Sequence, residues 1–478
     1  MNYQEVLNYL YAQLPMFQRI GAAAYKADLK NIQTLCKKMG HPEKKLKFIH
    51  IAGTNGKGSV SNMLAAIFQL NGYKTGLFTS PHLIDFRERI KVNGQMISKQ
   101  YVTRFVNQYK SLFDEVKPSF FEWTTILAFQ YFLDKKVDIV VLETGMGGRL
   151  DCTNVVTSEL SIITNIGEDH KQFLGDTLQK IAHEKAGIIK PNIPVLISEY
   201  QKEVLNVFKT KSEESEAPLF YAKNIVKINS YKHTSQYLDL SYSIINTNLN
   251  KNLDKSKNIS FNNQNNILEQ FKNNFRYIKL LNLDKSKIRE FKVKISLNST
   301  YQIKNVKCVL AACELLQLMN WKLKRELIHK AIQDTPKITG FRGRWDIIQI
   351  KPYLILDIAH NKQGLQNTLQ NLKRYQFQQL RIIFGVVNDK EIDEIIPLLP
   401  KKALYYVTQA SVPRALPANA LSEKLQSHHL NCNVFTPLHF AIQTALKEAN
   451  PDDLILVTGS AFVVADALNY LKNKSSKK

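Results

Sequence analysis

A glycine-rich segment in the first part of the chain is the strongest chemical signal in the sequence. Residues 49–59 read IHIAGTNGKGS, so an apolar run leads into a loop and then into the helix-like pattern of residues 60–70. In this order the backbone N–H groups of the loop and the positive end of the helix can face an anion. Nucleotide binding is therefore favoured over a structural turn. The loop residues in question are Gly53, Thr54, Asn55, Gly56, Lys57, Gly58 and Ser59.

The segment departs from the strict P-loop pattern. Ile51 stands where that pattern has its first glycine, and Gly58 follows Lys57 directly. Lys57 can still provide a mobile positive charge for the outer phosphates. The prediction therefore depends on the order of strand, loop and helix rather than on the motif alone.

A carboxylate follows the most apolar run of the chain. Residues 137–142 are almost continuously apolar, and Glu143 then leads into the sequence TGMGGRLD. A carboxylate at the end of a buried strand beside a phosphate loop suits Mg²⁺, which takes oxygen ligands and bridges phosphates. The alternative is an ordinary solvated acid. Gly145, Gly147 and Gly148 argue against that alternative, because they indicate a close approach of the backbone to something.

Other predicted strands also end in polar side chains. Ser80 follows residues 74–79, and His170 comes soon after residues 160–164. Because parallel strands end at one edge of a sheet, Ser80, Glu143 and His170 can converge on a metal ion, although each alone can also be a turn or a cap. In the second half, residues 357–361 (DIAHN) again follow an apolar run. Two such edges on separate domains predict an active site between domains.

The elements that must position these residues alternate between strand and helix, which predicts an α/β fold. We expect a P-loop-type ATP-binding domain with a parallel central sheet (1–337), followed by a smaller Rossmann-like α/β domain (338–478). A polar, Asn/Lys-rich insertion with short hairpins is expected at about 201–298, without assigned chemistry. The predicted strands are residues 48–52, 74–79, 137–142, 160–164, 194–198, 353–356, 380–385, 404–408, 433–435 and 454–457.

Composition narrows the class of protein. The chain has 478 residues, 44% of them hydrophobic and 22% charged, which is typical of a globular protein. Its net charge of +24 suggests a polyanionic partner, but AT-rich coding can supply the same lysines. The charge is mostly dispersed lysine, so a nucleic-acid-binding ATPase is the weaker alternative. The scattered cysteines, the N-terminal sequence and the absence of a long apolar run predict a cytoplasmic protein without a membrane partner.

Taken together, the motifs resemble the Mur ligase superfamily of ATP-dependent amide-forming enzymes, specifically the dihydrofolate synthase/folylpolyglutamate synthase family. The resemblance runs through almost the whole chain. Its further motifs are FQRIG (17–21), TSPHL (79–83), FRERI (86–90), FFE (120–122), TNV (153–155), GEDH (167–170), EKAGI (184–188), YQ (301–302) with Asn305, GR (343–344) and DIAHN (357–361).

The resemblance implies an ATP-dependent ligase that joins L-glutamate to dihydropteroate and to reduced folates through an acyl phosphate. It also implies Mg²⁺, as two ions, with K⁺ as a further candidate, and we expect a monomer. Lys57, Lys185, His170 and His360 would act in catalysis. Asn305, Arg344 and Asp357 would join the loop in contacting ATP. Ser80 and Glu143 would hold one metal ion, His170 would hold a second, and Lys185 would be a metal ligand as its carbamate.

The same resemblance implies a pteroate site and raises two local questions. The residues expected to line that site are Arg19, Phe120, Phe121, Glu122, Trp123, Leu150, Asp151 and Cys152. Ser299 stands where the family usually has glycine, and Lys362 replaces a frequent proline, so backbone geometry is in question at both positions. A non-catalytic homologue is a third reading, which the intact Lys57, Glu143, His170 and Lys185 argue against.

Overall fold

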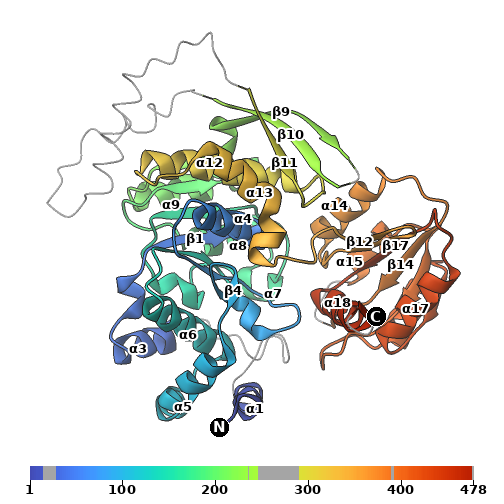
Figure 1. Ribbon diagram of the computed structural model, residues 1–478, viewed down its shortest axis with the longest axis horizontal. Helices are drawn as coiled ribbons and strands as arrows, with labels where there is room; N and C mark the ends of the chain where they lie inside the picture. Colours follow the sequence, from blue (N-terminus) through green and yellow to red (C-terminus); the bar gives the residue numbers. More distant parts are fainter. Residues whose placement is uncertain (14–27, 235, 246–289, 389–391, 476–478) are drawn as a thin grey trace. The chain divides into compact units, whose positions relative to one another are not determined.

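The computed structural model describes residues 1–13, 28–234, 236–245, 290–388 and 392–475 (Figure 1). The chain forms two compact units. The first comprises Met1–Leu10, Lys26–Pro81 and Arg89–Phe341, and the second comprises Tyr11–Tyr25, His82–Glu88 and Arg342–Lys478. In the described part of the chain, no helix is both long enough and apolar enough to span a membrane.

The first unit is built on an eight-stranded sheet. Its order is β4-β3-β2-β5-β1-β6-β7-β8, with β3 and β4 antiparallel and the other six strands parallel. The predicted parallel sheet is therefore confirmed, with an added antiparallel edge. The strands are β1 (Phe48–Ala52), β2 (Thr75–Phe78), β3 (Ile90–Val92), β4 (Gln95–Met96), β5 (Ile139–Glu143), β6 (Leu160–Ile163), β7 (Val195–Ile197) and β8 (Leu219–Tyr221).

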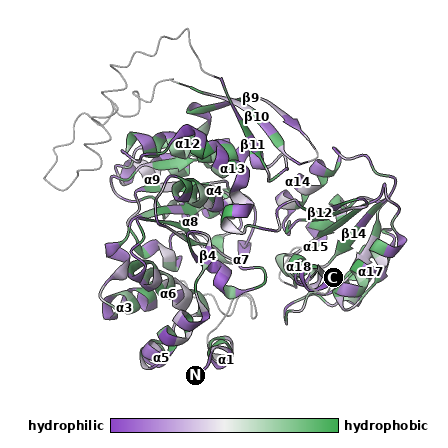
Figure 2. Ribbon diagram, viewed as in Figure 1, coloured by the Kyte–Doolittle hydropathy of each residue, from purple (hydrophilic) through white to green (hydrophobic). Residues whose placement is uncertain are grey.

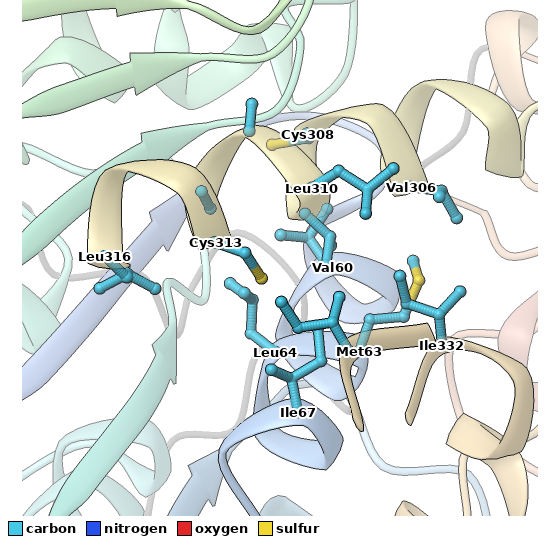
Figure 3. Packing of buried hydrophobic residues seen from close by; sticks show 14 of the residues in the cluster. Val60, Met63, Leu64, Ile67, Val306, Cys308, Leu310, Cys313, Leu316 and Ile332 are labelled. Atoms are coloured by element: carbon cyan, nitrogen blue, oxygen red, sulfur yellow. The ribbon is translucent and has the colours of Figure 1, made fainter. Parts of the chain in front are cut away.

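One face of this sheet is covered by helices α4 (Lys57–Leu70), α12 (Gln302–Leu318) and α13 (Arg325–Thr339). Every residue of α4 from Ser59 to Phe68 is buried, as expected for a helix enclosed on all sides. Figure 3 shows Val60 and Leu64 of α4 facing Leu310 and Cys313 of α12. This packing fixes the start of α4, and with it the glycine-rich loop.

The opposite face is covered by helices, two of which, α6 and α8, carry predicted site residues. Phe48 of β1 packs edge-on against Phe129, with ring centroids 5.6 Å apart. Surface helices such as α5 carry both hydrophilic and hydrophobic residues (Figure 2). The helices on this face of the sheet are α3 (Lys30–Lys38), α5 (Lys99–Val116), α6 (Phe120–Asp134), α8 (Leu178–Ala186) and α9 (Leu205–Glu214).

The region expected to be a polar insertion is more regular than predicted. Helix α9 and strand β8 lie within it, and β8 pairs in parallel with β7, so this part continues the main sheet. Strands β9 (Val226–His233), β10 (Leu238–Ile244) and β11 (Glu290–Ile295) form an antiparallel sheet whose apolar side joins the core beneath α12 and α13. Most of the Asn/Lys-rich segment, residues 246–289, lies outside the described residues.

The second unit contains a six-stranded sheet of order β12-β13-β17-β14-β15-β16, parallel except for β12. Buried clusters cover both faces, so the Rossmann-like expectation is confirmed. Leu83 packs in one of these clusters, which the sequence did not suggest. The elements are β12 (Asp346–Ile350), β13 (Tyr353–Leu356), α14 (Lys362–Leu372), β14 (Leu380–Phe384), α15 (Ile392–Ile395), β15 (Leu404–Val407), α16 (Ala418–Ser427), β16 (Cys432–Val434), α17 (Leu438–Glu448), β17 (Leu454–Thr458) and α18 (Ala461–Ser475).

Candidate active site

The glycine-rich loop connects β1 to α4 and needs two of its glycines for conformation. Gly53 has a φ of +146°, and a Cβ at this position would lie 1.8 Å from Oγ1 of Thr164. Gly56 has a φ of +91°, and a Cβ there would lie 2.4 Å from Oδ1 of Asn305. Neighbouring segments therefore contact the loop closely at both glycines, and a larger residue at either position would clash with them.

The segment that follows β6 holds this loop in place. The backbone N–H of Asn55 donates to Asn165 Oδ1 at 2.8 Å, and the Thr164 hydroxyl donates to the carbonyl oxygen of Asn55 at 2.7 Å. The hydroxyl oxygen of Thr54 lies 3.0 Å from both the carbonyl oxygen and the N–H of Gly167. The loop is thus pre-organised by the chain itself, which lowers the cost of ordering it around a phosphate.

Two lysine amines meet at one carbonyl of the loop. Lys57 Nζ donates to the carbonyl oxygens of Gly53 at 2.8 Å and Thr54 at 3.2 Å, and Lys185 Nζ donates to that of Gly53 at 3.1 Å. The pKa of Lys185 is lowered to about 7, mainly by burial and in addition by the charge of Lys57, while the charge of Asp169 acts in the opposite direction. A substantial fraction of the Lys185 amine is therefore uncharged near neutral pH.

Helix α8 carries Lys185 and packs closely on the segment that follows β5. Arg149 donates from Nε and Nη2 to Glu184 Oε1, at 3.1 and 2.8 Å. A Cβ on Gly148 would lie 2.9 Å from the carbonyl oxygen of Glu184, and one on Gly187 would lie 2.3 Å from Cα of Arg149. Close backbone approach at Gly148 was predicted, and the partner is helix α8.

Glu143 and Ser80 lie together at the carboxyl edge of the sheet. The N–H of Ser80 donates to Glu143 Oε2 at 3.2 Å, and Glu143 is only 3% exposed. A Cβ on Gly58 would lie 3.7 and 3.8 Å from the two Glu143 oxygens, so glycine leaves room beside the carboxylate. Carboxylate and hydroxyl oxygens fit Mg²⁺, whereas the amine of Lys185 does not fit unless it is converted to a carbamate.

His170 lies at the start of α7 (Lys171–Leu174), with Nε2 3.9 Å from Asp169 Oδ2. Asp169 in turn acts on the charge of Lys185. Among the residues that the structure describes, no group of three or more His, Cys, Asp or Glu side chains is arranged to hold a metal. Of the four residues expected to hold metal, Ser80 lies beside Glu143, and His170 lies beside Asp169, whose charge acts on Lys185.

The start of α12 is hydrogen-bonded to the loop. Gln302 Nε2 donates to the hydroxyl oxygen of Ser59 at 3.1 Å, and Asn305 Nδ2 donates to Gln302 Oε1 at 2.9 Å. Asn305 Oδ1 is the atom that faces Gly56. The predicted ATP contact Asn305 is thus joined to the loop through Gln302, for which the sequence suggested no separate role.

The residues expected to line the pteroate site differ in exposure. Phe121 and Leu150 are partly exposed, whereas Phe120, Glu122, Trp123, Asp151 and Cys152 are buried. Glu122 forms a capping box with Ser119 at the start of α6. Trp123 is fully buried, with its ring against those of Phe105, Phe113 and Phe120. Phe121 lies against Gly145 and Phe78, and Arg19 lies outside the described residues.

In the second unit, Asp357 directly follows β13 and links its own loop to the residue before β12 and to helix α14. Its carboxylate accepts hydrogen bonds from the N–H groups of Trp345 and Ala359, both at 3.0 Å, and from the hydroxyl of Thr368 at 3.2 Å. His360 Nδ1 lies 2.9 Å from the carbonyl oxygen of Ile358. Arg344 Nη1 donates to the carbonyl oxygen of Gly343 at 3.4 Å.

Comparison with known proteins identifies the family. The Mur ligase middle domain matches residues 51–313, and the Mur ligase glutamate ligase domain matches residues 343–461. The dihydrofolate synthase/folylpolyglutamate synthase of Bacillus subtilis (strain 168) is 30% identical, over 98% of this chain and 99% of that protein. The chain belongs to the dihydrofolate synthase/folylpolyglutamate synthase family of Mur ligases.

Solved structures agree with this assignment. This Mur ligase superposes on the folylpolyglutamate synthase of Thermotoga maritima with a TM-score of 0.74 and 29% identity, covering 98% of this chain and 96% of that one. The folylpolyglutamate synthase of Mycobacterium tuberculosis, complexed with ADP and AMPPCP, gives a TM-score of 0.78 and 25% identity over 98% and 99% of the two chains.

The two departures from the family pattern are accommodated in this Mur ligase. Ser299 is fully buried, its carbonyl oxygen accepts from Gln302 N at 3.1 Å, and it is not among the described residues with positive φ. Lys362 is the first residue of α14, which Asn361 caps by accepting from the N–H of Gly364. Neither position therefore requires the residue that the family usually has there.

Proposed function

We propose that this Mur ligase is an ATP-dependent acid–amino-acid ligase that adds L-glutamate to dihydropteroate and to the γ-carboxylate of reduced folates. The observation that carries this proposal is the match to the Bacillus subtilis enzyme over nearly the whole length of both chains. The pre-organised loop between β1 and α4 supports nucleotide binding, because its backbone and Lys57 suit a phosphate chain.

The chemistry proceeds in two steps. A carboxylate oxygen of the pteroate or folate attacks the γ-phosphorus of ATP, ADP leaves, and an acyl phosphate forms. The amine of glutamate then attacks the carbonyl carbon, and the tetrahedral intermediate loses phosphate and a proton to give the amide. Lys57 donates hydrogen bonds to two carbonyl oxygens of the loop in the structure. Its proposed role is to neutralise the negative charge that develops on the transferred phosphoryl group.

A divalent cation, when bound, neutralises phosphate charge, and Ser80 and Glu143 are the residues that would hold it. A second ion at His170 and a K⁺ ion are further parts of the proposal. Carbamylation of Lys185 is supported by its burial and its pKa of about 7. The uncharged amine can attack CO₂ and lose a proton, which replaces a potential positive charge with a carboxylate-like group.

The remaining roles are proposed from family membership. Asn305, Arg344 and Asp357 contact ATP, His360 helps to position glutamate, and the aromatic side of α6 with residues 150–152 binds the pteroate. The monomeric state and the cytoplasmic location stay predictions.

Product analysis tests the proposal. The purified protein is incubated with ATP and glutamate, once with dihydropteroate and once with tetrahydrofolate. We expect ADP release to require both the glutamate and the pterin substrate, with one glutamate added to each acceptor. ATP hydrolysis that is indifferent to both substrates would contradict the proposal, and activity with only one acceptor would restrict it to that reaction.

A further inference from the structure

A histidine lies in the middle of the central strand of the first sheet. His50 stands between Ile49 and Ile51 in β1 and is completely buried. Its side chain points to the face covered by α6 rather than to the face covered by α4, because neighbouring residues of a strand alternate between faces and Ile49 and Ile51 pack with α4. An imidazole inside an apolar parallel strand requires polar partners.

Those partners lie in the short helical turn that follows Asp151. His50 Nε2 lies 2.9 Å from Thr153 Oγ1, and that hydroxyl donates to Asp151 Oδ1 at 2.6 Å. Asp151 Oδ1 also accepts from the N–H of Thr153 at 3.1 Å, and Oδ2 accepts from the N–H of Met146 at 2.8 Å. The chain of hydrogen bonds thus runs from the core of β1 to a carboxylate in the segment expected to line the pteroate site.

The hydrogen bonds from His50 through Thr153 to Asp151 form a relay, and its direction follows from which groups have a hydrogen to donate. The Thr153 hydroxyl has one hydrogen and gives it to Asp151, so it must accept from His50. The imidazole therefore carries its hydrogen on Nε2. Nδ1 is then an acceptor, and it has no hydrogen-bond partner among the described residues.

The unpartnered Nδ1 makes His50 costly for folding. A leucine of similar volume in this buried position would avoid the desolvation of a polar nitrogen. The imidazole consequently contributes something that packing alone does not supply, and the one contact made by its polar atoms within the described residues leads to Asp151 through Thr153.

We propose that His50 and Thr153 are positioning residues for the acceptor substrate: their hydrogen-bond relay fixes the Asp151 carboxylate, and with it the segment from Gly145 to Cys152 that faces the pteroate or folate. This inference depends on the proposed function. The ATP loop is held separately, by the residues after β6 and by Gln302, so the relay acts on the acceptor and not on the nucleotide.

The test compares KM values in folded variants. His50→Leu and Thr153→Val remove the relay while keeping side-chain volume. We expect each to raise KM for dihydropteroate and reduced folate about tenfold, with KM for ATP changed less than about twofold. The double variant should also show about a tenfold rise, because both changes break the same chain of hydrogen bonds.

Conservative variants and a packing control distinguish a positioning role from a general contribution to stability. His50→Gln keeps a donor near the Nε2 position, and Thr153→Ser keeps the hydroxyl, so both should restore KM to within about twofold of wild type. Phe48→Leu, on the same face of β1, should lower the melting temperature without raising the acceptor KM selectively. His50→Leu should instead leave the melting temperature unchanged or raise it.

The outcomes are distinct. Equal rises in the KM values for ATP and acceptor, no change in either, or a selective rise in Phe48→Leu would each overturn the relay. Failure of both His50→Leu and Thr153→Val to fold would do the same, because it would assign the relay to stability. Wild-type protein that consumes ATP without regard to acceptor and glutamate would contradict the proposed function itself, and this is measured before any variant.

Discussion

The carboxyl edges of the two parallel sheets are built in different ways. In the first unit, the edge carries glycines with positive φ and two lysine amines that share the carbonyl of Gly53. In the second unit, Gly385 and Gly459 follow β14 and β17 and also lie close to neighbouring backbone, while the Asp357 carboxylate accepts hydrogen bonds from Ala359 in its own loop, from Trp345 before β12 and from Thr368 in α14. Close backbone approach is therefore common to both edges, but the first edge concentrates charged side chains around its loop, whereas the second uses its carboxylate to hold neighbouring segments of the fold together.

This difference predicts opposite consequences for two buried carboxylates. A change at the first edge should reduce turnover more than stability. A change at the second edge should reduce stability first.

Glu143→Gln tests the first edge and has the largest expected effect. The amide keeps the volume and can still accept from the N–H of Ser80, so the free energy of unfolding should change by less than about 1 kcal/mol. Because we propose that this charge holds the divalent cation, its loss should lower kcat by about 10³-fold. Glu159→Gln, at the amino end of β6, is the matched control and should keep wild-type turnover. Retained activity in Glu143→Gln would remove its metal role.

The sequence predicted the parallel strands of both sheets except β8, because strands buried on both faces are continuous apolar runs, whereas β8 is short and lies in the region expected to be a polar insertion. It did not predict β3, β4 and β12, which are short antiparallel edge strands with little pattern of their own. In the region where short hairpins were expected, β9 and β10 do form a hairpin, but their pairing with β11 was not predicted, since the polar segment 246–289 lies between β10 and β11 in the sequence.

Prediction of the site from the sequence is limited in the same way, because contacts between distant residues are not visible in the sequence. The loop from Gly53 to Ser59 was readable because its residues are adjacent in the sequence. The hydrogen bond from Gln302 to Ser59 joins residues 243 positions apart, and only the fold brings them together. The burial of Trp123 against Phe113 likewise depends on contacts that the local sequence does not reveal, whereas the cap formed by Glu122 with Ser119 follows the local S-x-x-E pattern and could have been predicted.

Two glycine variants sharpen the account of the first edge. Gly53→Ala places Cβ against Thr164 at a φ of +146°, so we expect a loss of about 2–4 kcal/mol in unfolding free energy, together with weaker ATP binding. Gly58→Ala, inside α4, meets only ordinary contacts of 3.6 Å or more and should stay within about 1 kcal/mol of wild type. Denaturant unfolding and ATP titration measure both effects. Equal stability losses would contradict the distinction between a glycine required by the fold and one that leaves room for a ligand.

Asp357→Asn tests the second edge. An amide offers one acceptor oxygen where the carboxylate offers two, so the hydrogen bonds from Trp345, Ala359 and Thr368 cannot all be kept. We expect a loss of about 1–3 kcal/mol in unfolding free energy. Asp452→Asn, exposed at the opposite edge of the same sheet, should have no measurable effect on stability. A variant with unchanged stability but a raised KM for ATP would show that Asp357 acts mainly on the nucleotide, and the two edges would then be alike.

The smallest expected effect is on the pH dependence of the unfolding free energy, to which His50 in the core of the first sheet should contribute. The pKa of His50 is lowered to about 3, mainly by burial and in addition by the charge of Lys190. As pH falls from 7 to 5, the unfolded chain gains a proton on this histidine while the folded chain does not, so unfolding becomes more favourable. His50→Leu lacks this contribution and should therefore lose about 1–2 kcal/mol less stability than wild type over that interval. The exposed His428, replaced by glutamine, meets water in both states and serves as the control for loss of a histidine. If the free energy of unfolding depended on pH in the same way in wild type and His50→Leu, His50 would have to gain its proton in the folded protein as well. The protonated Nδ1 would then donate to a partner outside the hydrogen-bond relay, which would contradict the proposed relay.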